Sequence, residues 1–293
     1  MSNVYELPEP LARALTVIWT PPKPGRIGVT SLIGSPLPRI LSIRHAAEID
    51  NDISENFWSL LGKAVHYIIE RSGPHTDIKI EHKVGGATLV GVIDYVENGH
   101  LIDWKLTSEW GAVFAADKDW ENQVQTYAYL AKKQSGVPIK KLSVYILMRD
   151  WNKRAARRSA DHPQLFFKQL SFEPWSDEVI ERYINERVRF HLEAEEFIEG
   201  EIPERFWCSG KERWQRLSKW AVMKKVEGRA YRVLANEEAA KAVCDREAKR
   251  TGKPCFVVFR PGEYIRCLSY CAYSGWCPGA PKDDEAGEGK NES

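Results

Sequence analysis

The chain has 293 residues, of which 43% are hydrophobic, and this is enough apolar material for a buried core in one or two domains. No apolar run approaches the roughly 20 residues that a membrane-spanning helix needs, and no secretory leader is recognisable, so we expect a soluble, cytoplasmic protein without membrane association. Six cysteines in a chain of this length do not indicate a disulfide scaffold, and we expect them to be buried thiols or metal ligands.

The formal net charge of +1 hides two regions of opposite sign. Residues 173–204 contain 11 acidic and 3 basic side chains, whereas residues 205–266 contain 16 basic and 7 acidic ones. The basic region favours a polyanionic partner such as DNA. Charge alone leaves a second interpretation open, in which the two regions neutralise each other across an interface.

The predicted elements begin after a proline-rich segment, residues 1–30, that we expect to be extended. Ser54 is a candidate N-cap for a helix whose apolar residues recur at helical spacing and which stops at Gly73-Pro74. Three strand-like runs follow, and the Asn98-Gly99 dipeptide predicts a hairpin between the second and the third. These runs cover residues 77–84, 88–96 and 101–106.

The second half of the predicted core repeats this mixture. A helix at 119–134 is followed by strands at 142–148 and 165–172 and by a long acidic helix at 176–200. The order of helices and strands predicts an α/β fold in which helices flank a central mixed β-sheet.

The composition changes after Pro203. We predict a core domain at 1–203, which includes an N-terminal extension, and a basic module at 204–280 that contains all six cysteines. Within this module, a strand–helix–strand unit is expected at 231–234, 237–250 and 255–259. The last segment, 281–293, lacks large apolar residues and is expected to be a disordered tail.

Two carboxylates and one ammonium group are predicted to converge on the hairpin. Asp94 lies near the end of one strand, and Asp103 and Lys105 lie on the next, where alternation gives both the same face. Clustered carboxylates repel each other, and a bound Mg²⁺ or Mn²⁺ removes this conflict. Such a metal can activate a water molecule, and Lys105 can stabilise charge at a phosphate. The alternative is a hairpin with charges exposed beside its turn.

These residues resemble the PD-(D/E)XK nuclease superfamily, and in particular its RecB-like branch. Asp94 corresponds to the first acidic residue of the family motif and Asp103-Trp104-Lys105 to its D-x-K, although Ile93 replaces the usual proline. The resemblance implies a restriction-endonuclease-like core, metal-dependent hydrolysis of DNA, and metal binding by Asp94 and Asp103.

Flanking motifs extend the resemblance. Gly62-Lys-Ala-Val-His66 matches a G-x-x-x-H helix motif, which makes His66 a candidate third metal ligand rather than a core histidine. Gln123 and Tyr127 match a Q-x-x-x-Y helix motif whose spacing puts both side chains on one helical face, where they are candidates to position DNA or the lysine. Glu81 resembles an acidic residue often found before the first aspartate, with either a metal-binding role or a simple pairing with a base.

The Q-x-x-x-Y register is not unique. Gln125 and Tyr129 repeat the same spacing within the same predicted helix. We prefer Gln123 and Tyr127 because the residues that follow continue the usual pattern of the related nucleases.

Four cysteines form a second candidate site. Three of them are spaced as C-x3-C-x5-C near the end of the folded chain, and a fourth lies about sixty residues earlier; they are Cys267, Cys271, Cys277 and Cys208. Thiolates favour zinc or an iron–sulfur cluster. The arrangement resembles phage-encoded nucleases of the superfamily, which implies a [4Fe–4S] cluster, with Zn²⁺ as the alternative. Cys244 and Cys255 are expected to be core thiols.

A segment rich in cations and tryptophans follows the first of these cysteines. Its cations can contact phosphates and its tryptophans can stack on unpaired bases, or the segment is a solvated helix whose tryptophans pack inward. Its candidate residues are Lys211, Arg213, Trp214, Arg216, Lys219, Trp220, Lys224 and Lys225. Arg154, Arg157 and Arg158, expected in a loop, are candidates for a second contact.

The sequence therefore predicts a Mg²⁺- or Mn²⁺-dependent deoxyribonuclease, and specifically an exonuclease that processes DNA ends in recombination or replication. A phage origin would place it in the host cytoplasm, with a single-strand annealing protein as a possible recombination partner. The competing hypotheses are a non-catalytic DNA-binding protein that keeps the nuclease fold and a redox-regulated DNA-binding protein. Polarity, strand preference and oligomeric state stay open.

Overall fold

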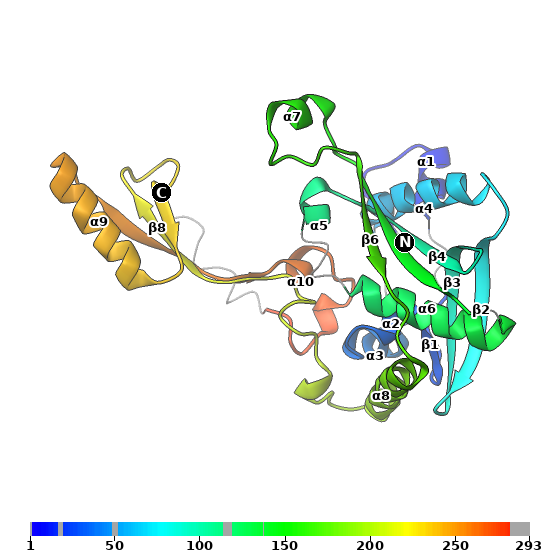
Figure 1. The fold of residues 1–293 in the computed structure, drawn as a ribbon. Helices are drawn as coiled ribbons and strands as arrows, with labels where there is room; N and C mark the ends of the chain where they lie inside the picture. The colour runs from blue at the N-terminus through cyan, green and yellow to red at the C-terminus, as the bar shows by residue number, and fades with distance from the viewer. Residues whose placement is uncertain (1, 17–19, 49–51, 114–118, 137, 282–293) are drawn as a thin grey trace. The chain divides into compact units, whose positions relative to one another are not determined.

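The structure is a computed structural model that describes residues 2–16, 20–48, 52–113, 119–136 and 138–281 (Figure 1). The chain divides into two compact units, Met1–Phe206 and Trp207–Ser293. Apart from Pro281, the predicted C-terminal tail lies outside the described residues.

A six-stranded mixed sheet forms the centre of the first unit, in the order β1-β3-β4-β5-β6 with β2 also paired to β3. The β1–β3 and β4–β5 pairs are parallel and the remaining pairs are antiparallel. The predicted α/β fold with a mixed sheet is thus confirmed. The strands are β1 (Arg26–Gly28), β2 (Thr76–Val84), β3 (Ala87–Glu97), β4 (His100–Thr107), β5 (Lys141–Met148) and β6 (Phe167–Phe172).

The predicted hairpin between β3 and β4 is also confirmed. Asn98 and Gly99 form its turn with φ values of 51° and 76°, the two positive angles that a type I′ turn requires. The two strands pair only next to this turn, from Tyr95 opposite Ile102 to Glu97 opposite His100. Beyond it they diverge, because β3 pairs with β1 and β4 continues along β5.

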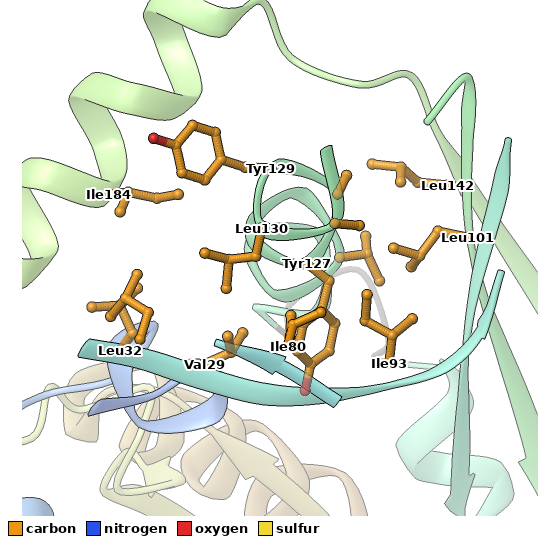
Figure 2. Packing of buried hydrophobic residues seen from close by; sticks show 14 of the residues in the cluster. Val29, Leu32, Ile80, Ile93, Leu101, Tyr127, Tyr129, Leu130, Leu142 and Ile184 are labelled. Carbon is orange, nitrogen blue, oxygen red and sulfur yellow. The ribbon is translucent and has the colours of Figure 1, made fainter. Parts of the chain in front are cut away.

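Two long helices contribute to the core of this unit, α6 (Trp120–Ser135) and α8 (Asp177–Glu195). Figure 2 shows Leu130 and Tyr127 of α6 among Ile80 and Ile93 of the strands. Helix α8 ends at Glu195, whereas the sequence predicted a helix to residue 200. Among the described residues, no helix combines the length and the apolar character that crossing a membrane demands.

The N-terminal segment is not the extended lead-in that its prolines suggested. It contains α1 (Glu9–Leu15) and α2 (Val29–Leu32), and the unpredicted α3 (Leu37–Arg44) comes next. Pro10 and Pro38 lie in the first turns of α1 and α3, where the missing N–H group has no helical partner to lose.

The helix α4 (Phe57–Glu70) follows a short 3₁₀ helix, η1 (Ile53–Asn56). Ser54 is not its cap: the Ser54 N–H donates to Asp52 Oδ1 at 2.9 Å, so Asp52 caps η1 instead. None of the residues of α4 is fully buried. The remaining short elements of the first unit are α5 (Glu109–Val113), α7 (Lys153–Arg158) and η3 (Glu204–Phe206).

The second unit has a three-stranded antiparallel sheet in the order β10-β8-β9, on which α9 packs (Figure 1). The predicted strand–helix–strand unit is confirmed by β9, α9 and β10. The central strand β8 lies in the cation-rich segment, for which a solvated helix was the alternative to a DNA contact, and the prediction of a helix there is wrong. A two-stranded ribbon, β11-β7, adjoins this sheet in sequence. The elements are β7 (Gln215–Arg216), β8 (Lys219–Met223), β9 (Arg232–Leu234), α9 (Glu237–Thr251), β10 (Phe256–Arg260), β11 (Glu263–Tyr264), α10 (Ile265–Ser269) and η4 (Ser274–Trp276).

Candidate active site

The two aspartates of the predicted site lie where β3 and β4 begin to diverge. Tyr95 is opposite Ile102, and continuing this antiparallel register by one residue puts Asp94 opposite Asp103. The backbone N–H of Trp104 donates to Asp94 Oδ2 at 2.8 Å. A side-chain carboxylate of β3 therefore bonds to β4 just beyond the last backbone pair of the two strands.

Lys105 and Gln123 surround the carboxyl group of Asp103, which is only 3% exposed. Lys105 Nζ lies 2.8 Å from Asp103 Oδ2 and donates to Gln123 Oε1 at 3.0 Å. Gln123 Nε2 in turn donates to Asp103 Oδ1 at 3.2 Å. The three side chains thus form a closed cluster between β4 and α6, and each of them is held by the other two.

Tyr127 lies one helical turn beyond Gln123, and its hydroxyl is 3.4 Å from Gln123 Nε2, which donates to it. Burial raises the pKa of Tyr127 to about 12, so the phenol stays protonated at neutral pH. The two residues of the competing Q-x-x-x-Y register make other contacts. Gln125 bonds to the backbone of Glu173 and Trp175, and the ring of Tyr129 lies near Lys133.

His66 approaches the cluster from α4. Its Nδ1 lies 3.4 Å from Asp94 Oδ1, and the ring is about one-third exposed. The hydrogen bond to Asp94 raises the pKa of His66, while burial acts in the opposite direction. The structure therefore brings His66, Asp94, Asp103 and Lys105 into one neighbourhood, reached from three different elements.

Glu81 is not part of this neighbourhood. Its carboxylate forms an exposed ion pair with Arg26 at 2.9 Å, and this partner lowers the pKa of Glu81. On the sheet, Glu81 pairs with Val90, four residues before Asp94. Of the two roles suggested for Glu81, pairing with a base is the one that the structure contains.

The negative charge of the Asp103 carboxylate is only partly offset by its neighbours. Burial raises the pKa of Asp103, Lys105 lowers it, and the nearby Asp94 raises it further. Asp103 Oδ2 is buried and, among the described residues, receives no hydrogen bond of good geometry despite its closeness to Lys105. Within the described part of the chain, no three His, Cys, Asp or Glu side chains stand at positions that could hold a metal ion.

Gly91 is a residue of the site that the sequence analysis missed. A Cβ atom at Gly91 would lie 2.7 Å from the Tyr127 ring, so the close packing of α6 on β3 depends on its absence. A glycine inside a run of β-branched residues was the available signal, because such glycines mark a close approach within a sheet.

The four predicted cysteine ligands all belong to the second unit and are partly buried. Burial raises the pKa of Cys208 to about 12, and Glu212 and the thiols of Cys277 and Cys271 add to the rise. Burial also raises the pKa of Cys277, where Cys271 and Cys267 contribute and hydrogen bonds from the backbone of residues 279 and 280 oppose it. The four thiols are thus electrostatic neighbours, and the high pKa values keep Cys208 and Cys277 protonated at neutral pH.

Packing explains why the first and last cysteines approach each other. A Cβ atom at Gly279 would lie 2.8 Å from the Trp207 ring, and Arg213 donates to the Gly279 carbonyl. The chain around Cys208 therefore packs on the chain that follows Cys277. The two other cysteines, Cys244 and Cys255, belong to the small core under α9, as the sequence suggested.

The cation-rich segment contains the strands β7 and β8 and not the helix of the second interpretation, whereas its contact with DNA stays a prediction. Trp214 packs on Tyr270 with ring centroids 5.2 Å apart, and Trp220 packs against the core under α9. Lys224 is bound to Glu247 at 2.6 Å. Arg154, Arg157 and Arg158 lie in the short helix α7 rather than in a loop.

We predict that Gly91→Ala displaces Tyr127 and, through it, Gln123. The introduced methyl group overpacks the contact between β3 and α6 and should cost about 1–3 kcal/mol in the free energy of unfolding. The nuclease activity expected from the sequence should fall more steeply than stability, because Gln123 bonds both Asp103 and Lys105. Chemical denaturation and cleavage assays test this, with Gly200→Ala as control, since a Cβ there meets nothing within 4 Å. Equal activity of Gly91→Ala and the parent would contradict it.

Two solved structures show a distant likeness: an alkaline exonuclease from Laribacter hongkongensis (17% identity, 60% of this chain and 90% of that one, TM-score 0.38) and a phage-related exonuclease from Haemophilus somnus (12% identity, 57% and 92%, TM-score 0.34). No match was found among curated proteins. The family model of the PD-(D/E)XK nuclease superfamily matches residues 46–278, most of the chain and all of the cluster around Asp103, so this protein belongs to the PD-(D/E)XK nuclease superfamily.

Proposed function

We propose that the protein is a divalent-metal-dependent deoxyribonuclease that hydrolyses phosphodiester bonds with His66, Asp94, Asp103 and Lys105. The observation that carries this proposal is the buried carboxylate of Asp103, which lies opposite Asp94 at the fork of β3 and β4 and has the single ammonium group of Lys105 at 2.8 Å. Two neighbouring carboxylates beside one ammonium group leave negative charge that a divalent cation would offset.

The donor set suits a hard divalent ion. Two carboxylates and one imidazole are compatible with Mg²⁺ or Mn²⁺, which take the rest of their coordination shell from water and substrate phosphates. We propose Asp94, Asp103 and His66 as the protein ligands, whose side chains would have to come closer together than they stand in this structure to surround an ion. A bound ion would supply Lewis-acid activation of the phosphodiester and of a water molecule.

Lys105 and Gln123 are assigned to positioning and charge stabilisation. Gln123 accepts one hydrogen bond from Lys105, and Asp103 attracts the same ammonium group. An ammonium has three donors, so at least one remains for a phosphate oxygen or the attacking water. Because Gln123 and Asp103 fix the ammonium before substrate arrives, Lys105 can stabilise developing negative charge without reorganising.

We further propose that cleavage starts at DNA ends, during recombination or replication. This part rests on the motifs around His66, Gln123 and Tyr127, which resemble the RecB-like branch of the superfamily. In that setting, a single-strand annealing protein is a suitable recombination partner, since it would take up the strand that end processing exposes.

The cysteines of the second unit are proposed to hold a [4Fe–4S] cluster, with Zn²⁺ as the alternative. This proposal rests on the order of the four cysteines in the sequence and on the backbone hydrogen bonds directed at Cys277, because such bonds stabilise cluster sulfur ligands. As described, no three of the thiols stand where they could hold a metal, so they would have to move closer together to bind the centre. A bound cationic centre would also reverse the pKa shifts, since coordination deprotonates thiols. We assign this centre a structural role.

Substitution of the cluster around Asp103 should abolish cleavage without unfolding the protein. Asp94→Asn and Asp103→Asn keep the side-chain shape but remove the negative charge that a metal needs. Lys105→Met keeps the apolar stem and should lose roughly 10²–10³-fold in turnover, the usual effect of removing one charge-stabilising donor. Release of acid-soluble nucleotides from linear duplex DNA, with Mg²⁺ or with EDTA, measures the effect.

The matched control for these variants is Glu186→Gln, which removes one carboxylate from an exposed position on α8. Its cleavage rate should equal that of the parent. Circular dichroism and thermal unfolding establish that all four variants are folded. Mg²⁺-dependent cleavage by Lys105→Met at a tenth of the parental rate or more would contradict the assigned role of Lys105.

The proposed dependence on ends is tested with one plasmid in two forms. A linear, end-labelled duplex should be degraded from its termini, whereas a covalently closed circle of the same sequence should resist. The label that is released first gives the polarity. Equal rates of nicking in the circle and the linear form would show an endonuclease instead.

The proposed metal centre of the second unit is tested by measuring the metal and sulfide content of the purified protein. Protein purified without oxygen should carry iron and acid-labile sulfide, about four of each per chain, and Cys271→Ser should lose both together with thermal stability. Cys255→Ser is the control, because Cys255 packs in the separate core under α9 and should leave metal content unchanged. Zinc in place of iron would select the alternative, and neither metal would overturn the proposal.

A further inference from the structure

Residues 219–260 form a small folded unit of their own, which we call the inserted unit. It consists of β8, β9, α9 and β10, and its separate core contains Val222, Ala240 and Cys244. The ribbon of β7 and β11 brackets it, so the chain enters and leaves at neighbouring points. There the Gly262 N–H donates to Ser218 Oγ at 2.9 Å. The inserted unit therefore interrupts the sequence between Cys208 and Cys267.

The inserted unit is strongly basic. It has 11 basic and 5 acidic residues, a net charge of +6 in 42 residues. Among its described residues only three cations have a carboxylate partner. Lys224 and Arg250 both contact Glu247, at 2.6 and 2.7 Å, and Lys241 contacts Glu237 at 2.6 Å. The other eight cations have no ion-pair partner in the described part of the chain.

Five of these eight cations gather at one end of the inserted unit. Pairing of Met223 with Phe256 brings the end of β8 next to the start of β10, which α9 precedes. The Lys224–Glu247 contact ties the loop after β8 to the last turns of α9. Exposed cations are found on both of these segments. We call Lys225, Arg229, Arg246, Lys249 and Lys253 the basic end.

The α9 part of the basic end presents its cations on one side of the helix. Arg246 and Lys249 lie three residues apart, on the side of α9 away from buried Ala240 and Cys244. Lys253 is exposed just beyond the helix, which ends at Thr251 and is followed by Gly252 with a φ of 66°. Such a group of exposed cations suits the phosphates of a DNA backbone.

The basic end is suited to phosphates rather than to bases. Two aromatic rings lie at this end of the unit. Tyr231 is already covered by Lys224, whose Nζ lies 3.7 Å from the ring centroid, and Phe256 is partly buried at the start of β10. The exposed Phe259 lies toward the other end of the sheet, where it pairs with Trp220. Without an open ring for stacking, contacts at the basic end would be electrostatic and independent of sequence.

We propose that the basic end of the inserted unit binds the phosphate backbone of duplex DNA, as a contact additional to the nuclease site. This inference rests on the proposed deoxyribonuclease function and adds to it a second place where the substrate is held. Neutralising two of its cations should weaken duplex binding, because fewer counterions are then released from the DNA. Each phosphate contact contributes about 0.9 to the slope of log Kd against log salt concentration.

The test uses the full chain and a labelled, blunt 30-base-pair duplex in EDTA, so that binding is measured without cleavage. Lys249→Gln/Lys253→Gln removes two charges from the basic end. The control, Lys241→Gln/Arg260→Gln, removes two charges from the same unit outside the basic end. Both variants have the same net charge, and all four side chains are exposed, so both should unfold at the parental temperature.

The variant of the basic end should bind roughly 10- to 60-fold more weakly at 0.1 M salt, with the slope of log Kd against log salt reduced by about 1.8. The control should bind as the parent does. Equal weakening of both variants, or none in either, would overturn the proposal. A loss confined to single-stranded DNA of the same length would show that the basic end holds unpaired strands and would overturn its assignment to duplex.

The result of this binding test can be distinguished from the result of the cleavage tests of the proposed function. If the parent cleaves DNA but the two variants bind alike, only the second contact fails. If the parent does not cleave with Mg²⁺ but the difference between the variants persists, the deoxyribonuclease assignment fails and the DNA contact stands.

Discussion

Asp103 keeps an ionisable carboxyl group almost completely away from water, in a sheet whose neighbouring inward residues are leucine, isoleucine and valine. A buried charge persists only if surrounding groups offset the lost hydration. Lys105 and Gln123 do so, and each must be held within about 3 Å. Helix α6 therefore has to lie close against β3, which is possible because Gly91 has no side chain to meet Tyr127. The position of α6 is thus coupled to the charge of one carboxyl group.

The mixed topology of the sheet creates the space for this site. If β3 and β4 had continued to pair as a regular hairpin, their backbone groups would have bonded to each other beyond Tyr95 and Ile102. Instead β1 pairs with β3, and β5 pairs with β4, so the two strands separate. Asp94 then bonds the Trp104 N–H with its side chain. The fork supplies two carboxylates, and α4 brings His66 to one of them.

Local patterns in the sequence were sufficient for the strands around the site and for the neighbours of Asp103, because alternation, the Asn98-Gly99 turn and the spacing of Gln123 and Tyr127 are short-range signals. The same reasoning failed where contacts between residues far apart in the sequence determine the structure. Glu81 has the right residue type and lies on the right strand, yet Arg26, fifty-five residues earlier, determines its partner. The strand β8 was missed because lysine and tryptophan obscure its short alternation, and only pairing with β9 and β10 defines it.

The division of charge between the two units follows from the chemistry of the site. Residues 1–206 carry a net charge of −4, from 25 basic and 29 acidic side chains, whereas residues 207–281 carry +8, from 15 and 7. A site that would use two carboxylates to bind a metal, as proposed here, works against the approach of a polyanion. At physiological salt the Debye length is about 8 Å, so attraction must come from cations that contact DNA directly. On the proposed second contact, DNA would be held by cations of a unit with a hydrophobic core of its own, so binding charge could be added there without placing further charged residues in the cluster around Asp103.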